Sequence, residues 1–214
     1  MQIKVVANVL KANEDMAAEN RRRLKTKGIK VMNIISSPGA GKTTILERTI
    51  EALKSELRLG VIEGDIMTSK DAERIDRHGV PVVQINTGGG CHLDANMVNK
   101  ALNELVLEEL ELLIIENVGN LVCPSSFDLG EDFKVVVLSV AEGDDKPLKY
   151  PAIFTKASVC LLNKIDLLPY SNFNLEVYYQ DMASLNPGLY TFEISAWKEE
   201  GMQPWYNYLS KLVR

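Results

Sequence analysis

The sequence predicts a doubly wound α/β domain, in which a mostly parallel sheet of about seven strands carries helices on both faces. From residue 30 onward, short apolar runs alternate with helix-patterned segments. Most of these runs are apolar throughout, which is typical of strands covered on both faces. The polar motifs follow the runs directly, at the strand ends where such sheets bind ligands. We assign residues 29–214 to this domain and residues 1–28 to an N-terminal helical extension.

The elements follow in order along the chain. The polar segment 5–27 is interpreted as a helix outside the main core, ended by Gly28. Strands are predicted at 30–36, 59–64, 81–85, 111–116, 134–140, 158–163 and 190–195. Helices are predicted at 41–57, 68–78, 93–109, 149–156, 171–184 and 201–212. Right-handed crossovers then join the parallel strands.

Composition excludes several classes of protein. The 214 residues are 46% hydrophobic and 25% charged, as in an ordinary globular domain rather than a disordered chain. The net charge of −5 argues against a nucleic-acid partner. No apolar run reaches the roughly 20 residues that span a bilayer, and the N-terminus does not resemble a signal peptide. We therefore expect a cytoplasmic protein whose three cysteines are free thiols or metal ligands.

A glycine-rich turn between the first strand and the following helix predicts a phosphate site. It reads Ser36-Ser-Pro-Gly-Ala-Gly-Lys-Thr-Thr44, a P-loop in which Ser36 replaces the usual first glycine. N–H groups at the helix start favour a polyphosphate. Lys42 is expected to reach the β- and γ-phosphates and Thr43 to bind Mg²⁺. The nucleotide contacts expected here are Gly39, Ala40, Gly41, Lys42, Thr43 and Thr44. The alternative is a turn that only packs the helix.

The motif Asn163-Lys-Ile-Asp166 predicts that the nucleotide is GTP. The Asp166 carboxylate would accept from guanine N1–H and the amino group, a donor pair that adenine lacks. The Lys164 stem would cover the ring, and Asn163 would tie this loop to the phosphate loop. Ser195 and Ala196 follow the last strand, where a backbone N–H is expected to meet the guanine carbonyl. The alternative is a solvated loop with a chance match.

Two carboxylates at strand ends are candidates for Mg²⁺ binding and catalysis. Asp65 and Glu116 would hold Mg²⁺ or orient the attacking water, with Asp65 the preferred water-positioning group. Gly119 would donate its N–H to the γ-phosphate. Asn120 follows it in place of glutamine, so slow intrinsic hydrolysis is expected. The alternative is that both carboxylates merely cap the elements that follow them.

Cys91, His92 and Cys123 suggest a transition-metal site. Thiolates and imidazole suit Ni²⁺ or Zn²⁺, and three ligands leave a tetrahedral site for a second chain to complete across a two-fold axis. The alternative is two buried cysteines and a capping histidine. Cys160, inside an apolar strand, is expected in the core. We hypothesise that the segment 116–123 senses γ-phosphate at one end and metal at the other.

Together these motifs resemble the HypB family, the GTPases of nickel insertion into hydrogenase and, in some organisms, urease. The matching stretches are Ser36–Thr43, Glu63–Asp65, Thr87–Ala95, Glu116–Pro124, Glu142–Tyr150 and Asn163–Asp166. The resemblance implies a GTP-dependent homodimer with Cys91, His92 and Cys123 at its metal-binding interface. It also implies work with a HypA-like nickel chaperone and a nickel-enzyme precursor such as the hydrogenase large subunit. Lys146 would lie near the dimer contact, where it touches the partner's nucleotide or remains a solvated lysine.

Three functions compete on this reading. The favoured one is a GTP hydrolase that acts as a switch in nickel delivery. The second is a metal carrier or scaffold with incidental GTPase activity. The third is a small-molecule kinase, which requires an arginine-rich lid that the sequence does not show and leaves Asn163–Asp166 without a purpose.

Overall fold

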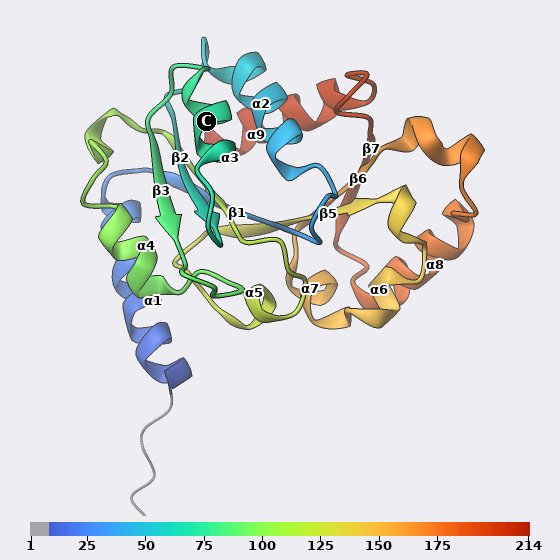
Figure 1. The fold of residues 1–214 in the computed structure, drawn as a ribbon, viewed down its shortest axis with the longest axis horizontal. Helices are drawn as coiled ribbons and strands as arrows, with labels where there is room; N and C mark the ends of the chain where they lie inside the picture. The colour runs from blue at the N-terminus through green and yellow to red at the C-terminus, as the bar shows by residue number, and fades with distance from the viewer. Residues whose placement is uncertain (1–8) are drawn as a thin grey trace, which may run out of the picture.

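The computed structural model describes residues 9–214, which form one seven-stranded parallel sheet with helices on both faces (Figure 1). The strands are β1 Lys30–Ser36, β2 Leu59–Asp65, β3 Val82–Asn86, β4 Leu112–Glu116, β5 Phe133–Ser139, β6 Val159–Asn163 and β7 Tyr190–Ile194. They lie in the order β3-β2-β4-β1-β5-β6-β7. The predicted fold class is confirmed, and each predicted strand boundary is within one residue of the observed one.

The helices fill the connections between these strands. They are α1 Val9–Thr26, α2 Lys42–Leu53, α3 Lys70–Asp76, α4 Ala95–Ala101, α5 Cys123–Ser126, α6 Lys146–Lys149, α7 Pro151–Lys156, α8 Leu175–Leu185 and α9 Met202–Val213. Short 3₁₀ turns occupy Leu107–Glu109, Val140–Glu142 and Ile165–Tyr170. Across residues 9–214, no helix combines the length and apolar character needed to cross a membrane.

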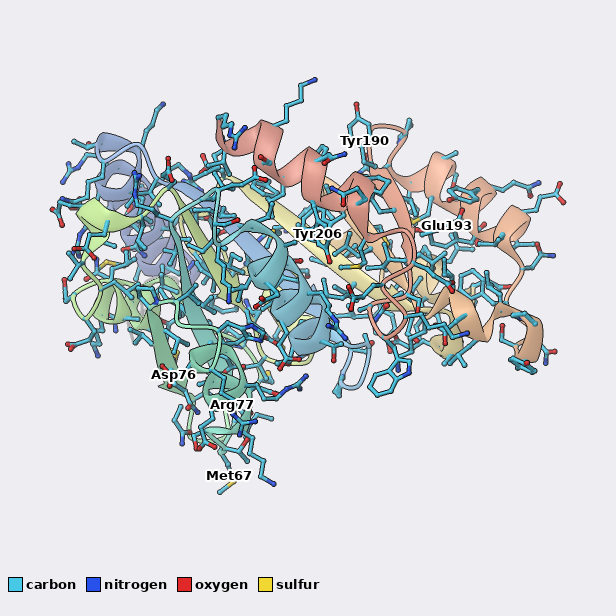
Figure 2. The ribbon with its side chains drawn as sticks, turned by 90° about the horizontal axis from the view of Figure 1, so that it is seen from above. Met67, Asp76, Arg77, Tyr190, Glu193 and Tyr206 are labelled. Atoms are coloured by element: carbon cyan, nitrogen blue, oxygen red, sulfur yellow. The ribbon has the colours of Figure 1, made fainter. Side chains whose placement is uncertain are left out.

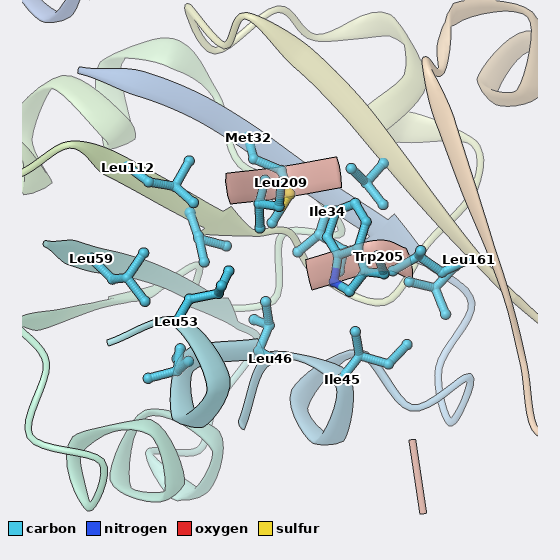
Figure 3. Packing of buried hydrophobic residues seen from close by; sticks show 14 of the residues in the cluster. Met32, Ile34, Ile45, Leu46, Leu53, Leu59, Leu112, Leu161, Trp205 and Leu209 are labelled. Carbon is cyan, nitrogen blue, oxygen red and sulfur yellow. The ribbon is translucent and has the colours of Figure 1, made fainter. Parts of the chain in front are cut away.

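One face of the sheet is covered by α2, α3 and α9. Side chains from these helices interlock with the apolar rows of the central strands, where Ile34 and Leu161 lie close to Trp205 (Figure 3). Trp205 is fully buried, and its indole N–H donates to the hydroxyl of Thr49 at 3.0 Å. Because the indole N–H is hydrogen-bonded, burial of the large ring stabilises the fold without the cost of an unpaired donor. This packing holds the start of α2 in position at the end of β1.

The opposite face is covered in two halves. Helices α1 and α4 lie side by side over β2 and β4, whereas α7 and α8 cover β5 and β6 (Figure 1). The prediction that the N-terminal helix lies outside the main core is wrong, because Ala17 and Leu24 of α1 are buried. Residues 5–8 of that predicted helix, and the start of the predicted extension, fall outside the described residues. The division at residue 28 stays a prediction.

Several predicted helices differ in extent. The predicted helix 93–109 ends at Ala101 and resumes only as the 3₁₀ turn at 107–109. Leu102, Leu105 and Leu107 are buried all the same, so the apolar spacing runs on through a turn and imitates a longer helix. The predicted helix 149–156 is divided at Tyr150, just before a proline that cannot supply a backbone N–H. Helix α5 was not predicted, because four residues carry too little periodicity.

Candidate functional site

The P-loop segment borders a cavity of about 390 Å³ at the carboxyl ends of β1, β2 and β4. Of the six predicted nucleotide contacts in this loop, five line the cavity: Gly39, Gly41, Lys42, Thr43 and Thr44. Ala40 is fully buried, and its carbonyl accepts a hydrogen bond from the Asn163 amide. Gly41 has φ +100°, and a Cβ there would lie 2.5 Å from Asn163 Nδ2, so both conformation and space require glycine. The loop therefore presents the free N–H groups of α2 to the cavity.

Lys42 is held over the mouth of this loop. Its ammonium donates to the hydroxyl of Ser36 at 3.1 Å and lies 4.0 Å from Glu116 Oε1. The side chain is only 10% exposed. Ser36, which stands where the usual motif has glycine, thus supplies a hydrogen-bond acceptor to the lysine. An ammonium in this position is available to phosphate oxygens.

Glu63 and Glu116 lie side by side in the register of β2 and β4. Both are buried, and Glu116 Oε1 accepts from the Thr43 hydroxyl at 3.0 Å. Oε2 of each carboxyl has no hydrogen-bond partner among the described residues. Burial raises the pKa of Glu116 to about 7, and burial together with the charge of Glu116 raises the pKa of Glu63 to about 8. Unpartnered carboxylate oxygens beside a hydroxyl fit Mg²⁺, which prefers oxygen ligands.

The sequence interpretation missed Glu63 as a site residue. A signal was present, because a glutamate interrupts the apolar run Val61-Ile-Glu, and a charge on a doubly covered strand requires a reason.

Exchanging Glu63 for glutamine is expected to stabilise the nucleotide-free protein at high pH. The pKa of this carboxyl rises from 4.5 to about 8 on folding, so the folded state keeps a proton that the unfolded state releases. The free energy of unfolding therefore falls as pH rises through that window. Glutamine is uncharged and avoids this loss. Without Mg²⁺, the melting temperature of Glu63→Gln should be higher than that of the parent at pH 8.5 and nearly equal to it at pH 5. The exposed Glu104→Gln serves as control, and an equal shift at both pH values contradicts the prediction.

Asp65 ends β2 and lines the same cavity. Its carboxylate accepts from the Met67 N–H at 2.9 Å and from the N–H and hydroxyl of Thr68. Burial acts to raise the pKa of Asp65, but these hydrogen bonds outweigh it and the pKa is lowered. The loop it caps projects outward, with Met67 at its tip (Figure 2). Asp65 therefore caps a loop and also lies within 4.8 Å of ligand oxygens from Glu63 and Asp71.

Gly119 brings the segment after β4 against the phosphate loop. A Cβ on this residue would approach Pro38 to 3.2 Å, closer than ordinary packing allows. Gly119 also lines the phosphate cavity. The start of the segment 116–123 therefore lies against both the phosphate loop and the cavity.

A second pocket, of about 290 Å³, shares Gly41 and Thr44 with the P-loop. Lys164, Asp166 and Trp197 line it, and Asp166 Oδ1 is buried with no protein partner in the described chain. Lys164 adopts a left-handed conformation with φ +63°, and its ammonium donates to the Gly39 carbonyl at 2.8 Å. An unpartnered acceptor in a pocket beside the phosphate site suits the N–H pair of guanine.

Asn163 joins three loops at this pocket. Its amide donates to the Ala40 carbonyl at 2.9 Å, so the predicted tie to the phosphate loop is confirmed. Its Oδ1 accepts from the Ala196 N–H at 3.1 Å. The Ala196 N–H, which was predicted to meet guanine, therefore donates to Asn163 within the protein. Asn163 can bind both loops because its amide has a donor and an acceptor. The neighbouring Ser195 is fully buried and accepts from the Lys198 N–H.

The structure brings Cys91, His92 and Cys123 together, with their ligand atoms all within 4.8 Å of one another. Cys91 Sγ lies 3.7 Å from His92 Nδ1, and Cys91 is exposed. A hydrogen bond with Cys91 raises the pKa of the Cys123 thiol. Burial lowers the pKa of His92, which keeps its imidazole neutral and able to ligate. Two thiols and a neutral imidazole fit Ni²⁺ or Zn²⁺. Cys160 is fully buried away from this cluster, as predicted.

The segment 116–123 and the loop before α4 are joined by two asparagines. Asn117, buried beside the phosphate cavity, accepts from the Leu93 N–H at 3.2 Å. Asn120 donates to the Cys91 carbonyl at 3.3 Å. The first bond connects a residue that lines the phosphate cavity to the residue after His92, and the second connects the segment 116–123 to Cys91 itself.

Comparison with known proteins places this geometry in a family. A family model described as "CobW/HypB/UreG, nucleotide-binding domain" matches residues 30–193. The hydrogenase maturation factor HypB of Rhizobium leguminosarum bv. viciae is 52% identical over 207 residues, which are 97% of this chain and 69% of that protein. The chain belongs to the HypB family of hydrogenase maturation factors. The resemblance drawn from the motifs is thus confirmed.

Solved HypB structures share the fold. HypB from Helicobacter pylori in complex with nickel matches with a TM-score of 0.90 and 42% identity, covering 95% of each chain. HypB from Archaeoglobus fulgidus matches with a TM-score of 0.89 and 37% identity, covering 95% of this chain and all of that one. The HypB family thus includes a member crystallised with nickel.

Proposed function

We propose that this protein is a GTP-hydrolysing metallochaperone, which couples GTP binding and hydrolysis to nickel delivery during maturation of a nickel enzyme such as hydrogenase or urease. One observation carries the proposal. The single segment 116–123 begins with Glu116 and Gly119 in the phosphate cavity and ends with Cys123 in the thiol–imidazole cluster. If a nucleotide at one end of this segment changes the metal affinity at the other, the metal must change the nucleotide affinity by the same factor.

Lys42 and the N–H groups of the P-loop would bind the β- and γ-phosphates and stabilise charge that develops on the γ-phosphoryl oxygens. The Thr43 hydroxyl and the Glu116 carboxylate would hold Mg²⁺, with Asp65 or Glu63 on its other side. Bound Mg²⁺ neutralises phosphate charge. Asp65 would orient the attacking water. Slow intrinsic turnover follows, since Asn120 replaces the glutamine expected after Gly119.

Nickel would be the cargo rather than a resident cofactor. Cys91, His92 and Cys123 supply three ligands, so a second copy of the chain would complete the site in a homodimer. Zn²⁺ suits the same donors. A HypA-like nickel chaperone would supply the ion, and the precursor of the nickel enzyme would receive it. Lys146, whose ammonium lies over the Tyr150 ring, would stand near the dimer contact.

Size-exclusion chromatography tests this proposal directly. The protein is run with GDP or a slowly hydrolysed GTP analogue, with and without Ni²⁺ or Zn²⁺, and GTP affinity is measured for each metal state. The proposal expects a nucleotide- or metal-dependent dimer and a GTP affinity that changes with metal. A monomer under every condition, with one GTP affinity throughout, removes the coupling and leaves the metal carrier with incidental hydrolysis.

Asp166→Asn is expected to reduce GTP affinity by roughly 10–100-fold, the range for one or two lost charge-assisted hydrogen bonds. The amide offers one acceptor and turns its N–H groups toward the guanine donors. Xanthosine triphosphate, which carries a carbonyl in place of the amino group, should gain affinity in the variant. Isothermal titration with GTP, ATP and xanthosine triphosphate measures both effects, and Asp181→Asn on α8 provides the control. Unaltered preference for GTP contradicts the role of Asp166.

A further inference from the structure

We propose that α1 is a brace that sets the spacing between the two segments carrying the thiol–imidazole cluster, and that Asn13 and Asn20 are its positioning residues. This inference rests on the proposed metal-binding role of that cluster. It goes beyond that role, since neither asparagine touches a candidate ligand.

Asn13 bonds to both segments at once. Its Oδ1 accepts from the Ala95 N–H at 2.8 Å, and its Nδ2 donates to the Asp128 carbonyl at 2.8 Å. Ala95 begins α4, three residues after His92, and Asp128 follows α5, which begins at Cys123. One side chain on α1 therefore links backbone from the Cys91–His92 side to backbone from the Cys123 side.

Asn20 repeats this arrangement two turns further along α1. Its Nδ2 donates to the Ala95 carbonyl at 2.8 Å and to the Leu129 carbonyl at 3.1 Å. Its Oδ1 accepts from Asn99 on α4 at 2.8 Å. The side chain is fully buried. The N–H and the carbonyl of Ala95 are thus each held by a different asparagine of one rigid helix.

The backbone groups that Asn13 and Asn20 bind lie next to the thiol–imidazole cluster. The His92 ring packs on the Phe127 ring with centroids 3.9 Å apart, and Phe127 directly precedes Asp128. A change in the separation of Ala95 from Asp128 and Leu129 would therefore move His92 relative to Cys123. Arg21, on the same helix, adds an ion pair with the Asp128 carboxylate at 2.7 Å.

The residue type supports positioning rather than simple helix docking. Leu24 and Ala17 already attach α1 by burying apolar side chains, so docking by itself does not require the two asparagines. A side-chain amide in this place has a donor and an acceptor on one planar group, so it fixes the distance between two backbones. Partners behind a metal ligand commonly govern its affinity in this way.

Metal affinity and spectra of Asn13→Ala and Asn20→Ala test the brace. Ni²⁺ affinity is measured by competition with a chromophoric chelator, and Co²⁺ absorption reports ligand geometry. We expect both variants to bind Ni²⁺ roughly 10–100-fold more weakly than the parent chain, the range for outer-shell partners. Their thiolate-to-metal absorption should also change. Basal GTP turnover should not change, because neither residue lines the phosphate cavity.

Asn186→Ala is the matched control. Asn186 also donates from its amide to backbone carbonyls, those of Phe154, Thr155 and Ala157 at 3.0, 3.5 and 2.9 Å, but on the α7–α8 side of the sheet. The melting temperature of Asn186→Ala should fall as that of Asn13→Ala does, whereas its metal affinity and spectrum should equal those of the parent. Should Asn20→Ala fail to fold, the less buried Asn13→Ala decides alone.

The two possible failures are distinguishable. If the parent chain binds no Ni²⁺ in a Cys91- and Cys123-dependent manner, the proposed function fails and the brace has nothing to position. If the parent binds but Asn13→Ala keeps its affinity and Co²⁺ spectrum, the metal site stands and the brace is refuted.

Discussion

Lys42→Ala is expected to lower GTP turnover by roughly 100–1,000-fold, the loss found when one preorganised donor to a developing oxyanion is removed. The lysine is almost enclosed, and its ammonium donates to Ser36 and lies 4.0 Å from Glu116. The variant lacks the ammonium that the P-loop offers to the γ-phosphoryl oxygens. Glu116, left without the nearby positive charge, would also resist ionisation and hold Mg²⁺ less well. Phosphate release at saturating GTP and Mg²⁺ measures the effect.

Lys54→Ala provides the matched control, because Lys54 caps the other end of the same helix and forms a surface ion pair with Glu51. Its turnover should equal that of the parent. Turnover of Lys42→Ala within about twofold of the parent would show that the loop binds no reacting phosphate. A chain lacking Lys42 that still matured a nickel enzyme in cells would favour the carrier over the switch.

The strands could be predicted because burial leaves a strong local pattern. β4 reads Leu112-Leu-Ile-Ile-Glu116 and is buried at every position, since helices cover both of its faces. Local patterns predict helix ends less well. The leucines that follow α4 stay in the same apolar cluster after the helix has stopped, so spacing alone does not show the break at Ala101. The docking of α1 was missed for a related reason, because few apolar residues attach it and buried asparagines supply much of the contact.

The site was partly predictable for a topological reason. Motifs at the carboxyl ends of parallel strands must meet at one edge, which is why the P-loop and Glu116 line one cavity. The proximity of Cys91 to Cys123 was expected on the same ground. The pairing of Glu63 with Glu116 and the hydrogen bond from the Ala196 N–H to Asn163 depend on contacts between distant segments. The linear order of residues does not show such contacts directly.

Cys123→Ala is expected to weaken Ni²⁺ binding by more than about 100-fold, beyond the roughly 10–100-fold loss typical of an outer-shell partner. The variant keeps Cys91 and His92, which cannot enclose the ion by themselves. The raised pKa of Cys123 means that metal must displace its proton, so parent affinity should fall as pH is lowered, and less steeply in the variant. Chelator competition between pH 6.5 and 8.5 measures both effects.

Cys160→Ala separates this loss from a general effect of removing a thiol. Cys160 lies on β6, fully buried, and its removal should cost some stability while Ni²⁺ affinity stays unchanged. The sharper distinction lies in the nucleotide. If the segment 116–123 transmits between its ends, Cys123→Ala must also abolish the dependence of GTP affinity on metal, because linkage is reciprocal. Weak metal binding with the metal dependence of GTP affinity intact would mean that the two sites communicate by another route, through Asn117 and Leu93 rather than through Cys123.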